Sequence, residues 1–435
     1  MRAASFAFPL CLVVFLSAAA SQAQQVPQAD LEANPRMERD FLAYDPHYKE
    51  EKQQRIERIR AVAAEVLKNE SAGQKTACSH QILFEAMSLI MSSADFKLID
   101  RRLEDAEASL ANPELQAKAE KPDPSDGSLG GCYLEWYLRV GASYDQLRKS
   151  RHDPNQQSPL PPWLDRIATP AKLTDYLVSI SVSDISHTGI DHEREFNDML
   201  AVLTRMLIRD SNIFVPAQLK TTLLDLIKNR LRNPKTGWWG ESYSRNGHVD
   251  FVDDLSITFH LVSYLNGKVP DMDKVIDTTL AVKDMDYPVG WLWKGQPWNH
   301  NNMDVVTLFQ YGWPVASDRQ RKAMQAEIEK MLHWCLTGSL QPDGSFKPVI
   351  ADGSLEESME YGVAFLARIG FFDKSKRFWT NQDFPQAEEV RARIMAFVKK
   401  HEASGGAGGT QYQGVLEDLN ESPEKQKQKQ KKSGD

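Results

Sequence analysis

Cysteine is scarce in this sequence, which has four in 435 residues. Cys11 lies in an N-terminal apolar segment, so Cys78, Cys132 and Cys335 remain, without the paired short spacing of a zinc site. In an oxidising compartment one pair could form a disulfide, and we expect it to be Cys78–Cys132. Cys335 falls on the apolar face of a predicted helix, which favours an inert core thiol. The sequence therefore predicts no metal site built on cysteine.

Excess basic charge, long apolar runs and strand-like alternation are also missing. Lysine and arginine number 52 against 60 acidic residues, a net charge of −8, so a nucleic-acid partner is not expected. Beyond the N-terminal segment no run approaches the roughly 18 apolar residues that a membrane-spanning helix needs. Once that segment is removed, we expect no membrane partner. The few strand signals favour an all-α fold over an α/β one.

The N-terminus has the pattern of an export signal. Arg2 supplies the positive start, an apolar stretch follows, and Ser21-Gln22-Ala23 resembles a small-residue cleavage site. We therefore expect residues 1–23 to be a signal peptide and the mature protein to be secreted or periplasmic. The polar, proline-punctuated residues 24–50 predict a flexible arm.

The remaining residues divide into one long helical region and a tail. Residues 51–403 are predicted to form a single domain, and 404–435, with five lysines in the last stretch and no apolar anchor, a disordered tail. Helical patterns begin at about 51–69, 78–93 and 99–111. The segment Ala111–Gly131 is rich in Pro, Asp, Ser and Gly, and predicts a long surface loop.

A repeated plan is clearest in residues 187–373. Gly237, Gly290 and Gly344 each open a glycine–aromatic turn, and they lie 53 and 54 residues apart. After each turn a polar loop leads into an almost wholly apolar run, which indicates a helix buried on all sides. Between these runs lie amphipathic stretches such as Arg319–Leu336, which predict helices with one face to water.

Alternating buried and amphipathic helices predict an α/α toroid, a double ring of inner and outer helices that need not close. The loops that lead into the inner helices would then gather on one rim. That rim would also carry the inner-helix N-termini, with their unpaired N–H groups and partial positive charge. We expect a functional site there.

The segment Asn299-His300-Asn301-Asn302 is the sharpest polar cluster in these loops. An imidazole exchanges a proton near neutral pH, and the amides could hold a carboxylate or hydroxyls of a ligand. The alternative is that Asn301 or Asn302 simply caps the helix that follows.

Other candidate catalytic side chains come from the loops before the inner helices. Two of the carboxylates could act as an acid/base pair. For Asp250 and Asp253 calcium binding is the alternative, and Asp254 could instead cap the helix that follows. No other cofactor is expected. The candidates are Tyr243, Arg245, His248, Asp250, Asp253, Asp304, Glu356 and Glu357.

Six of the ten tryptophans fall between residues 238 and 313. Flat aromatic faces in a polar cleft suit sugar rings, so a polysaccharide or oligosaccharide is the expected partner. Trp238 occupies the repeated turn position, where a packing role is the alternative. The tryptophans outside the repeat plan, and therefore the better ligand candidates, are Trp239, Trp293 and Trp298.

The segment Gly237–Leu265 resembles the Gly-Trp, Tyr and Asp-Asp pattern of α/α-toroid pectate lyases. The repeat is similar to those of toroid polysaccharide lyases, glycosidases and terpene cyclases, and Gln341–Phe346 is similar to the glutamine–aromatic turn of the cyclases. The Asp-x-Asp-Asp run of the cyclases is missing, since Asp250–Asp254 has another spacing. The resemblance implies a toroid architecture.

Together these patterns predict a carbohydrate-active enzyme, either a polysaccharide lyase or a glycoside hydrolase. In a lyase, His300 or Tyr243 would take the proton beside a uronate carboxyl group, and Asn299, Asn301 and Arg245 would stabilise the charge. In a hydrolase, two of the carboxylates would act as acid and base. The rival hypothesis is a toroid that binds a glycan or a protein without catalysis.

Overall fold

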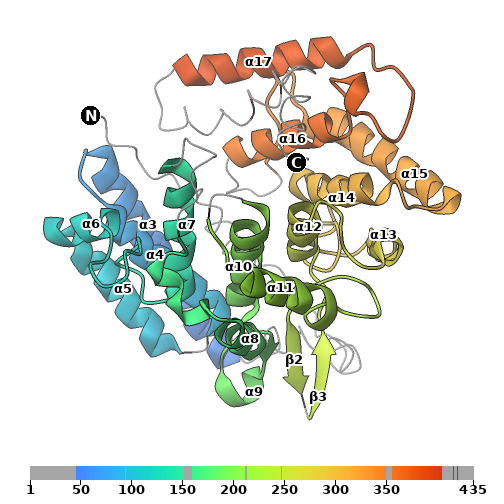
Figure 1. Ribbon diagram of the computed structural model, residues 1–435. Coiled ribbons are helices and arrows are strands. Elements are labelled where there is room, and N and C mark those ends of the chain that lie inside the picture. Colours follow the sequence, from blue (N-terminus) through green and yellow to red (C-terminus); the bar gives the residue numbers. More distant parts are fainter. Residues whose placement is uncertain are drawn as a thin grey trace. The chain divides into compact units, whose positions relative to one another are not determined.

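The computed structural model describes residues 46–403 apart from 94, 151–158, 211–212, 246 and 349–354, together with Val415 and Leu419. Most elements are helices, and the strands form one small sheet, which confirms the predicted all-α class (Figure 1). The predicted signal peptide, the arm up to residue 45 and nearly all of the tail lie outside the described residues. Val415 and Leu419 in that tail have buried side chains.

The chain divides into two compact units at Leu265/Asn266, here called the N-terminal and C-terminal units. No helix among the residues described has both the length and the apolar character needed to cross a membrane. The helices of the N-terminal unit are α3 (Pro46–Ser71), α4 (Ala77–Ser92), α5 (Phe96–Leu110), α6 (Pro113–Glu120), α7 (Trp136–Ser150), α8 (Pro170–Ser179), α9 (Ile185–Thr188), α10 (Glu193–Thr204), α11 (Ala217–Asp225) and α12 (Leu255–Tyr264).

Helices α3, α4 and α5 confirm the predicted N-terminal helices and pack against one another (Figure 1). The start of α3 at Pro46 shows that the last part of the predicted arm, residues 46–50, is helical. A disulfide joins Cys78 to Cys132, as expected. Beside it, the buried guanidinium of Arg102 pairs with Glu85 and donates to the Cys132 carbonyl oxygen at 2.8 Å.

The predicted surface loop 111–131 is wrong in its first part, because α6 occupies residues 113–120. Asn112 caps this helix by accepting from the Glu114 and Leu115 amides, and Pro113 stands in the first turn, where its missing N–H costs nothing. The buried Gln116 then ties α6 to α4 by accepting from the Cys78 amide at 2.8 Å. The sequence contains the capping signal Asn112-Pro113, but the polar composition of the segment favoured the prediction of a loop.

The later helices of the N-terminal unit pack in neighbouring pairs. Helix α10 packs against α7 and α12, and α8 packs against α11. The amphipathic stretch 216–231 consists of α11 followed by a π-helical turn, Leu226–Arg230. Asp254 caps α12 by accepting from the Ile257 amide at 3.0 Å, which confirms the capping alternative for this residue.

The polar loop predicted before α12 contains a β-hairpin instead of irregular chain. Strands β2 (Ser242–Arg245) and β3 (His248–Phe251) pair antiparallel, and β1 (Val182–Ser183) pairs parallel with β2, so the sheet order is β1-β2-β3. Arg245 pairs with His248 at the end of the hairpin, and Gly247 just before His248 has φ +78°. A two-residue turn with a positive-φ glycine is a favoured hairpin connection.

The C-terminal unit contains α13 (Met272–Ala281), α14 (Asn299–Gly312), α15 (Asp318–Trp334), α16 (Leu355–Arg368) and α17 (Ala387–Ala403). Helices α14 and α16 pack against each other, and α13 packs against both α14 and α15. Helix α14 is buried nearly all round, as its apolar run predicted. The predicted stripe of α15 is buried at Met324, Ile328 and Met331.

All three predicted glycine–aromatic turns exist, and each contains an isolated β-bridge. Their aromatic side chains are buried: Trp238 and Phe346 are 0% exposed and Trp291 is 4% exposed. A Cβ atom on Gly290 would stand 2.1 Å from the Met285 carbonyl oxygen, so only glycine allows this turn to close. The helices that follow are α12, α14 and α16.

Candidate functional site

Two facing helices of the C-terminal unit place His300 among acidic and aromatic side chains. Helix α14 carries His300 and Asp304 one turn apart, and α16 carries Glu357 and Tyr361 one turn apart. Side chains four residues apart share a helix face, and the packing of α14 on α16 brings the two pairs together. We call these four residues the His300 cluster.

The imidazole of His300 lies between two carboxylates. Its Nδ1 is 3.4 Å from Glu357 Oε1, and its Nε2 is 4.0 Å from Asp304 Oδ2. Asp304 is fully buried, whereas His300 keeps 27% of its side chain exposed. A partly exposed imidazole beside a carboxylate is an arrangement that suits general acid–base catalysis.

Aromatic rings continue from His300 in both directions. The Tyr361 ring is stacked on the imidazole, with centroids 3.7 Å apart. On another side Trp298 meets the imidazole edge-on at 4.7 Å, followed by Trp293 at 5.2 Å from Trp298 and Tyr287 at 6.1 Å from Trp293. We call Tyr287, Trp293 and Trp298 the aromatic row. All three side chains are half-buried, so each is fixed by packing and retains some exposed surface.

The asparagines beside His300 have structural partners. Helix α14 starts at Asn299 with Trp298 as its N-cap, so Asn301 and Asn302 lie inside the helix and the capping alternative is wrong. Asn299 Nδ2 donates to Ser339 Oγ at 2.9 Å, and Asn301 Nδ2 donates to the Trp291 carbonyl oxygen at 2.8 Å. Both side chains, and that of Asn302, are buried. These amides position the first turn of α14.

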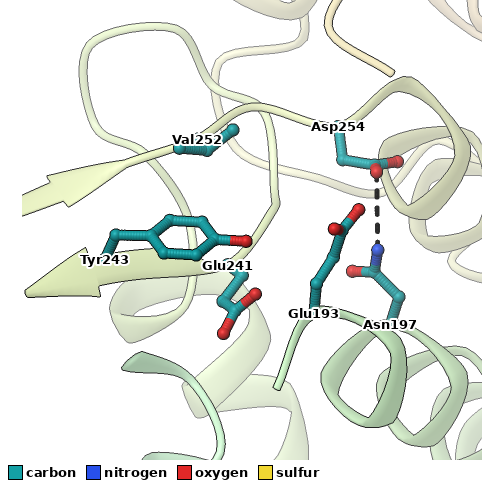
Figure 2. A pocket seen from close by; sticks show the side chains of 6 residues that line it. All are labelled: Glu193, Asn197, Glu241, Tyr243, Val252 and Asp254. Atoms are coloured by element: carbon teal, nitrogen blue, oxygen red, sulfur yellow. Dashed lines mark hydrogen bonds between the residues drawn. The ribbon is translucent and has the colours of Figure 1, made fainter. Parts of the chain in front are cut away.

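A second cluster lies in the N-terminal unit, where the hairpin meets the start of α10. Its pocket is lined by Glu193, Asn197, Glu241, Tyr243, Val252 and Asp254 (Figure 2). In Figure 2 the carboxyl groups of Glu193 and Asp254 point toward each other, and Asn197 Nδ2 donates to Asp254 at 3.4 Å. The volume open to the centre of a water molecule is about 0 Å³, so these side chains fill the pocket themselves.

Glu241, which lines this pocket, forms a buried carboxyl pair with Asp191. Ser183 Oγ donates to Glu241, while the Tyr243 hydroxyl donates to Asp191 Oδ1 at 3.1 Å and the Glu193 amide donates to the same oxygen at 3.0 Å. Burial, and next the charge of Asp191, raise the pKa of Glu241 to about 9. Glu241 is therefore protonated at neutral pH.

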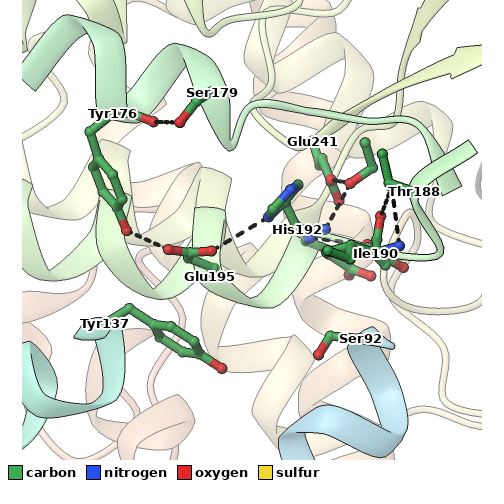
Figure 3. Close-up of polar contacts among 12 residues, drawn as sticks. Ser92, Tyr137, Tyr176, Ser179, Thr188, Ile190, His192, Glu195 and Glu241 are labelled. Carbon is green, nitrogen blue, oxygen red and sulfur yellow. Dashed lines mark hydrogen bonds and ion pairs between the residues drawn. The ribbon is translucent and has the colours of Figure 1, made fainter. Parts of the chain in front are cut away.

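The first turn of α10 is anchored by a further acidic residue, Glu195 (Figure 3). Its carboxylate accepts from the Tyr176 hydroxyl at 2.8 Å and lies 3.4 Å from His192 Nδ1. The His192 amide in turn donates to Ser183 Oγ at 2.7 Å. These contacts fix the segment between β1 and α10, so the carboxyl pair belongs to a rigid polar network.

The remaining predicted residues of the N-terminal unit do not converge. His248 and Asp250 are exposed on β3, and Arg245 is on β2, its side chain outside the described part of the structure. Asp253 accepts from Asn233 Nδ2 at 3.0 Å and Thr236 Oγ1 at 2.9 Å, and burial raises its pKa. Asp253 therefore holds the turn that precedes it.

Trp239 is 0% exposed, and its Nε1 donates to the Ile227 carbonyl oxygen at 2.7 Å. The structure therefore uses this side chain as a core residue of the N-terminal unit. In the C-terminal unit, the side chain of Glu356 lies outside the described part of the structure, whereas Glu357 is in the His300 cluster. Within the described ranges, no three His, Cys, Asp or Glu side chains are arranged to hold a metal ion.

Sequence reasoning missed several members of both clusters. Tyr361 follows Glu357 by four residues on a predicted helix, so its position on the same face was readable in the sequence. Tyr287 precedes the repeated turn. Its contact with Trp293 depends on the geometry of that turn, so the sequence alone did not indicate it. Glu241 and Asp191 are 50 residues apart and meet because β1 pairs with β2, which no local pattern indicated.

Comparison with protein-family models, with curated proteins and with solved structures gave no significant match for this chain. Function must therefore be inferred from the geometry of the two clusters. The N-terminal pocket holds a protonated carboxyl group but has no room for water. The His300 cluster combines a partly exposed imidazole with an aromatic row, and is the better candidate active site.

Proposed function

We propose that this chain is an exported carbohydrate-active enzyme that cleaves a polysaccharide at the His300 cluster. The observation that carries the proposal is the convergence of His300 from α14 with Glu357 and Tyr361 from α16. Half-buried aromatic side chains beside a general acid–base group suit a sugar polymer, because the C–H faces of sugars are apolar. Both a lyase and a hydrolase need such a proton-transfer group.

The proposed fold around this site is an α/α toroid, complete or open. Its support is the packing within each unit: the inner helices α10 and α12 are neighbours, as are α14 and α16. The outer helices α8 and α11, and α13 and α15, are neighbours in the same way. In two concentric layers, inner helices are neighbours of inner helices and outer helices are neighbours of outer helices.

His300 would exchange the proton in the reaction, and Glu357 would hold the imidazole in place through Nδ1. In a lyase the imidazole takes the proton beside a uronate carboxyl group, and the glycosidic oxygen leaves as a double bond forms. In a hydrolase, water adds its hydroxyl to the anomeric carbon and its proton goes to the leaving oxygen. In a hydrolase Asp304, on the other side of the imidazole, is the carboxylate that could act together with His300, while Glu357 keeps its positioning role.

Export to the periplasm or the exterior is part of the proposal. The signal-like N-terminus and the disulfide Cys78–Cys132 both support it, because disulfides persist mainly in oxidising compartments. Polysaccharides are also accessible there to a secreted enzyme.

The test is a screen of the purified mature protein on neutral and uronate polysaccharides, measuring reducing ends and the ultraviolet absorbance of unsaturated uronates. We expect His300→Ala to lower kcat by about 100-fold or more. The matched control is His333→Ala, since His333 is an exposed histidine on α15 of the same unit. Full turnover by His300→Ala would refute catalysis at this cluster.

The aromatic row also favours a second candidate, a glycan-binding protein without catalysis. A binding protein needs the rings but no reactive group. If the protein binds oligosaccharides without releasing reducing ends or unsaturated products from any polysaccharide, the binding role is correct and the enzyme proposal fails.

A further inference from the structure

We infer that the His300 cluster takes a linear glycan of uncharged sugars, laid along the aromatic row of Tyr287, Trp293 and Trp298. This inference rests on the proposed function for its location, and it adds the substrate class and the direction in which the chain extends from His300. It narrows the two reactions considered above to hydrolysis, because a lyase of the kind considered there needs a uronate.

The row is longer than one sugar. Its two steps measure 6.1 Å from Tyr287 to Trp293 and 5.2 Å from Trp293 to Trp298, and a third of 4.7 Å reaches the His300 imidazole. Successive rings at such intervals can each contact a different sugar of one chain. A site for a monosaccharide would not need the outer rings, so the row favours a polymer.

The backbone that carries the row is held in a closed turn. A β-bridge pairs Trp293 with Gln296, with N–H···O distances of 2.7 and 3.0 Å in the two directions. Asp286 Oδ1 accepts from the Gly295 amide at 2.7 Å and so fastens the turn to the residue before Tyr287. A pre-ordered surface loses little conformational entropy when a flexible glycan binds.

The charges around the row oppose an acidic sugar. The Glu357 carboxylate stands 3.4 Å from His300 Nδ1, so a uronate carboxylate next to the reacting bond would come close to it. Two of the neighbouring amide groups that could have received that carboxylate are engaged, since Asn299 donates to Ser339 and Asn301 to Trp291, and the third, Asn302, is buried. An uncharged sugar avoids this repulsion.

One cation lies on the turn itself. Lys294 is exposed and has φ +49°, between Trp293 and the glycine at 295. It is the side chain on this turn that an acidic glycan would use, so it supplies a decisive control. Lys294→Gln keeps a long polar side chain and removes the charge.

The experiment is calorimetric titration of the mature protein with cello-, xylo-, manno- and chito-oligosaccharides of one to six sugars, and with oligogalacturonates of the same lengths. We expect at least one of the uncharged oligosaccharide series to bind, with an affinity for the protein that rises with the number of sugars and levels off once the aromatic row is covered. Trp293→Ala and Tyr287→Ala should each weaken binding of the longer sugars by between about twofold and tenfold. Neither should change binding of the shortest sugars that bind.

Two variants serve as controls, and unfolding temperatures establish that every variant folds. Trp313→Ala removes a half-buried tryptophan of the same unit that packs on Phe378, away from the row, and should leave binding unchanged. Lys294→Gln should also leave neutral-glycan binding unchanged. Preference for oligogalacturonate that is lost in Lys294→Gln would overturn the inference.

The outcomes separate this inference from the proposed function. Length-dependent neutral binding without cleavage would support the substrate class and count against the enzyme proposal. Cleavage of uronate polymers alone would support the enzyme proposal and overturn the substrate class. Failure of every oligosaccharide to bind, or neutral binding that ignores Trp293 and Tyr287, would overturn the inference as well.

Discussion

The phenol ring of Tyr361 lies flat on the imidazole of His300, with centroids 3.7 Å apart and planes 9° apart. Glu357, one turn earlier on α16, contacts the same imidazole through Nδ1 at 3.4 Å. One helix therefore fixes both the plane of the ring and the orientation of its nitrogen atoms. Several consequences of this relationship, and of the buried carboxyl pair in the other unit, can be measured.

The stacked ring, not the phenol hydroxyl, should matter to His300. Tyr361→Phe keeps the aromatic face and is expected to retain kcat within about twofold, whereas Tyr361→Ala frees the imidazole to rotate. A misplaced catalytic group loses roughly 10- to 100-fold in rate. Steady-state kinetics on the substrate found in the screen would check this. A loss in Tyr361→Phe as large as in Tyr361→Ala would assign the role to the hydroxyl instead.

The Glu241–Asp191 pair should make stability fall as pH rises. Burial raises the pKa of Glu241 from its ordinary value of 4.5 to about 9, so the folded state binds this proton more tightly than the unfolded state does. Its stabilising contribution is complete below about pH 4.5 and is lost as pH rises through 9. Unfolding temperatures between pH 5 and 9 would show the decline.

Glu241→Gln is the matched variant for this pH effect, because an amide can donate to Asp191 without titrating. Its unfolding temperature should fall less steeply with pH than that of the wild type. Glu50→Gln, at an exposed position of α3, should keep the wild-type slope. If Glu241→Gln and the wild type decline in parallel, the carboxyl pair does not hold a proton in the folded state.

The disulfide should be a large part of the stability of the N-terminal unit. Its cysteines are 54 residues apart in sequence, and the chain-entropy relation gives about 4 kcal/mol for a loop of that length. Reductant should lower the unfolding temperature of the wild type to that of the Cys78→Ala/Cys132→Ala protein, and leave the double variant unchanged. An equal response of both proteins to reductant would contradict the assignment.

Asp253 is expected to stabilise its turn and to leave catalysis alone. Removing its carboxylate in Asp253→Ala leaves Asn233 and Thr236 without their acceptor, at a cost of about 1–3 kcal/mol. Denaturant unfolding would measure this loss, and kcat of the folded variant should equal that of the wild type. A large drop in kcat with unchanged stability would return Asp253 to the catalytic residues.

The sequence allowed the repeat to be predicted because its signals are local. Gly290 is forced by the close approach of the Met285 carbonyl, and the apolar run after His300 requires burial on every side. These constraints act within a few turns of chain, so the three turns and the apolar helices that follow them could be predicted from the sequence. The carboxyl group of Asp254 was correctly considered as a cap for the same reason.

The composition of each cluster could not be predicted in the same way. Glu357 reaches His300 only because α16 packs on α14, and Glu241 meets Asp191 only through strand pairing. Trp239 was predicted to bind a ligand because it lies outside the repeat plan. In the structure its indole N–H donates to the Ile227 carbonyl oxygen in the core. Tertiary packing decides which side chains meet in each cluster, and the period of the repeat carries no information about that packing.

The most direct measurement of the central claim is a double-mutant cycle between His300 and Glu357, with kcat measured for the wild type, His300→Ala, Glu357→Gln and the double variant. If Glu357 acts by holding the imidazole, its loss has no further effect once His300 is gone. We predict that the double variant is as slow as His300→Ala alone. Losses that multiply, or single variants with full turnover, would contradict a joint catalytic role for these two residues.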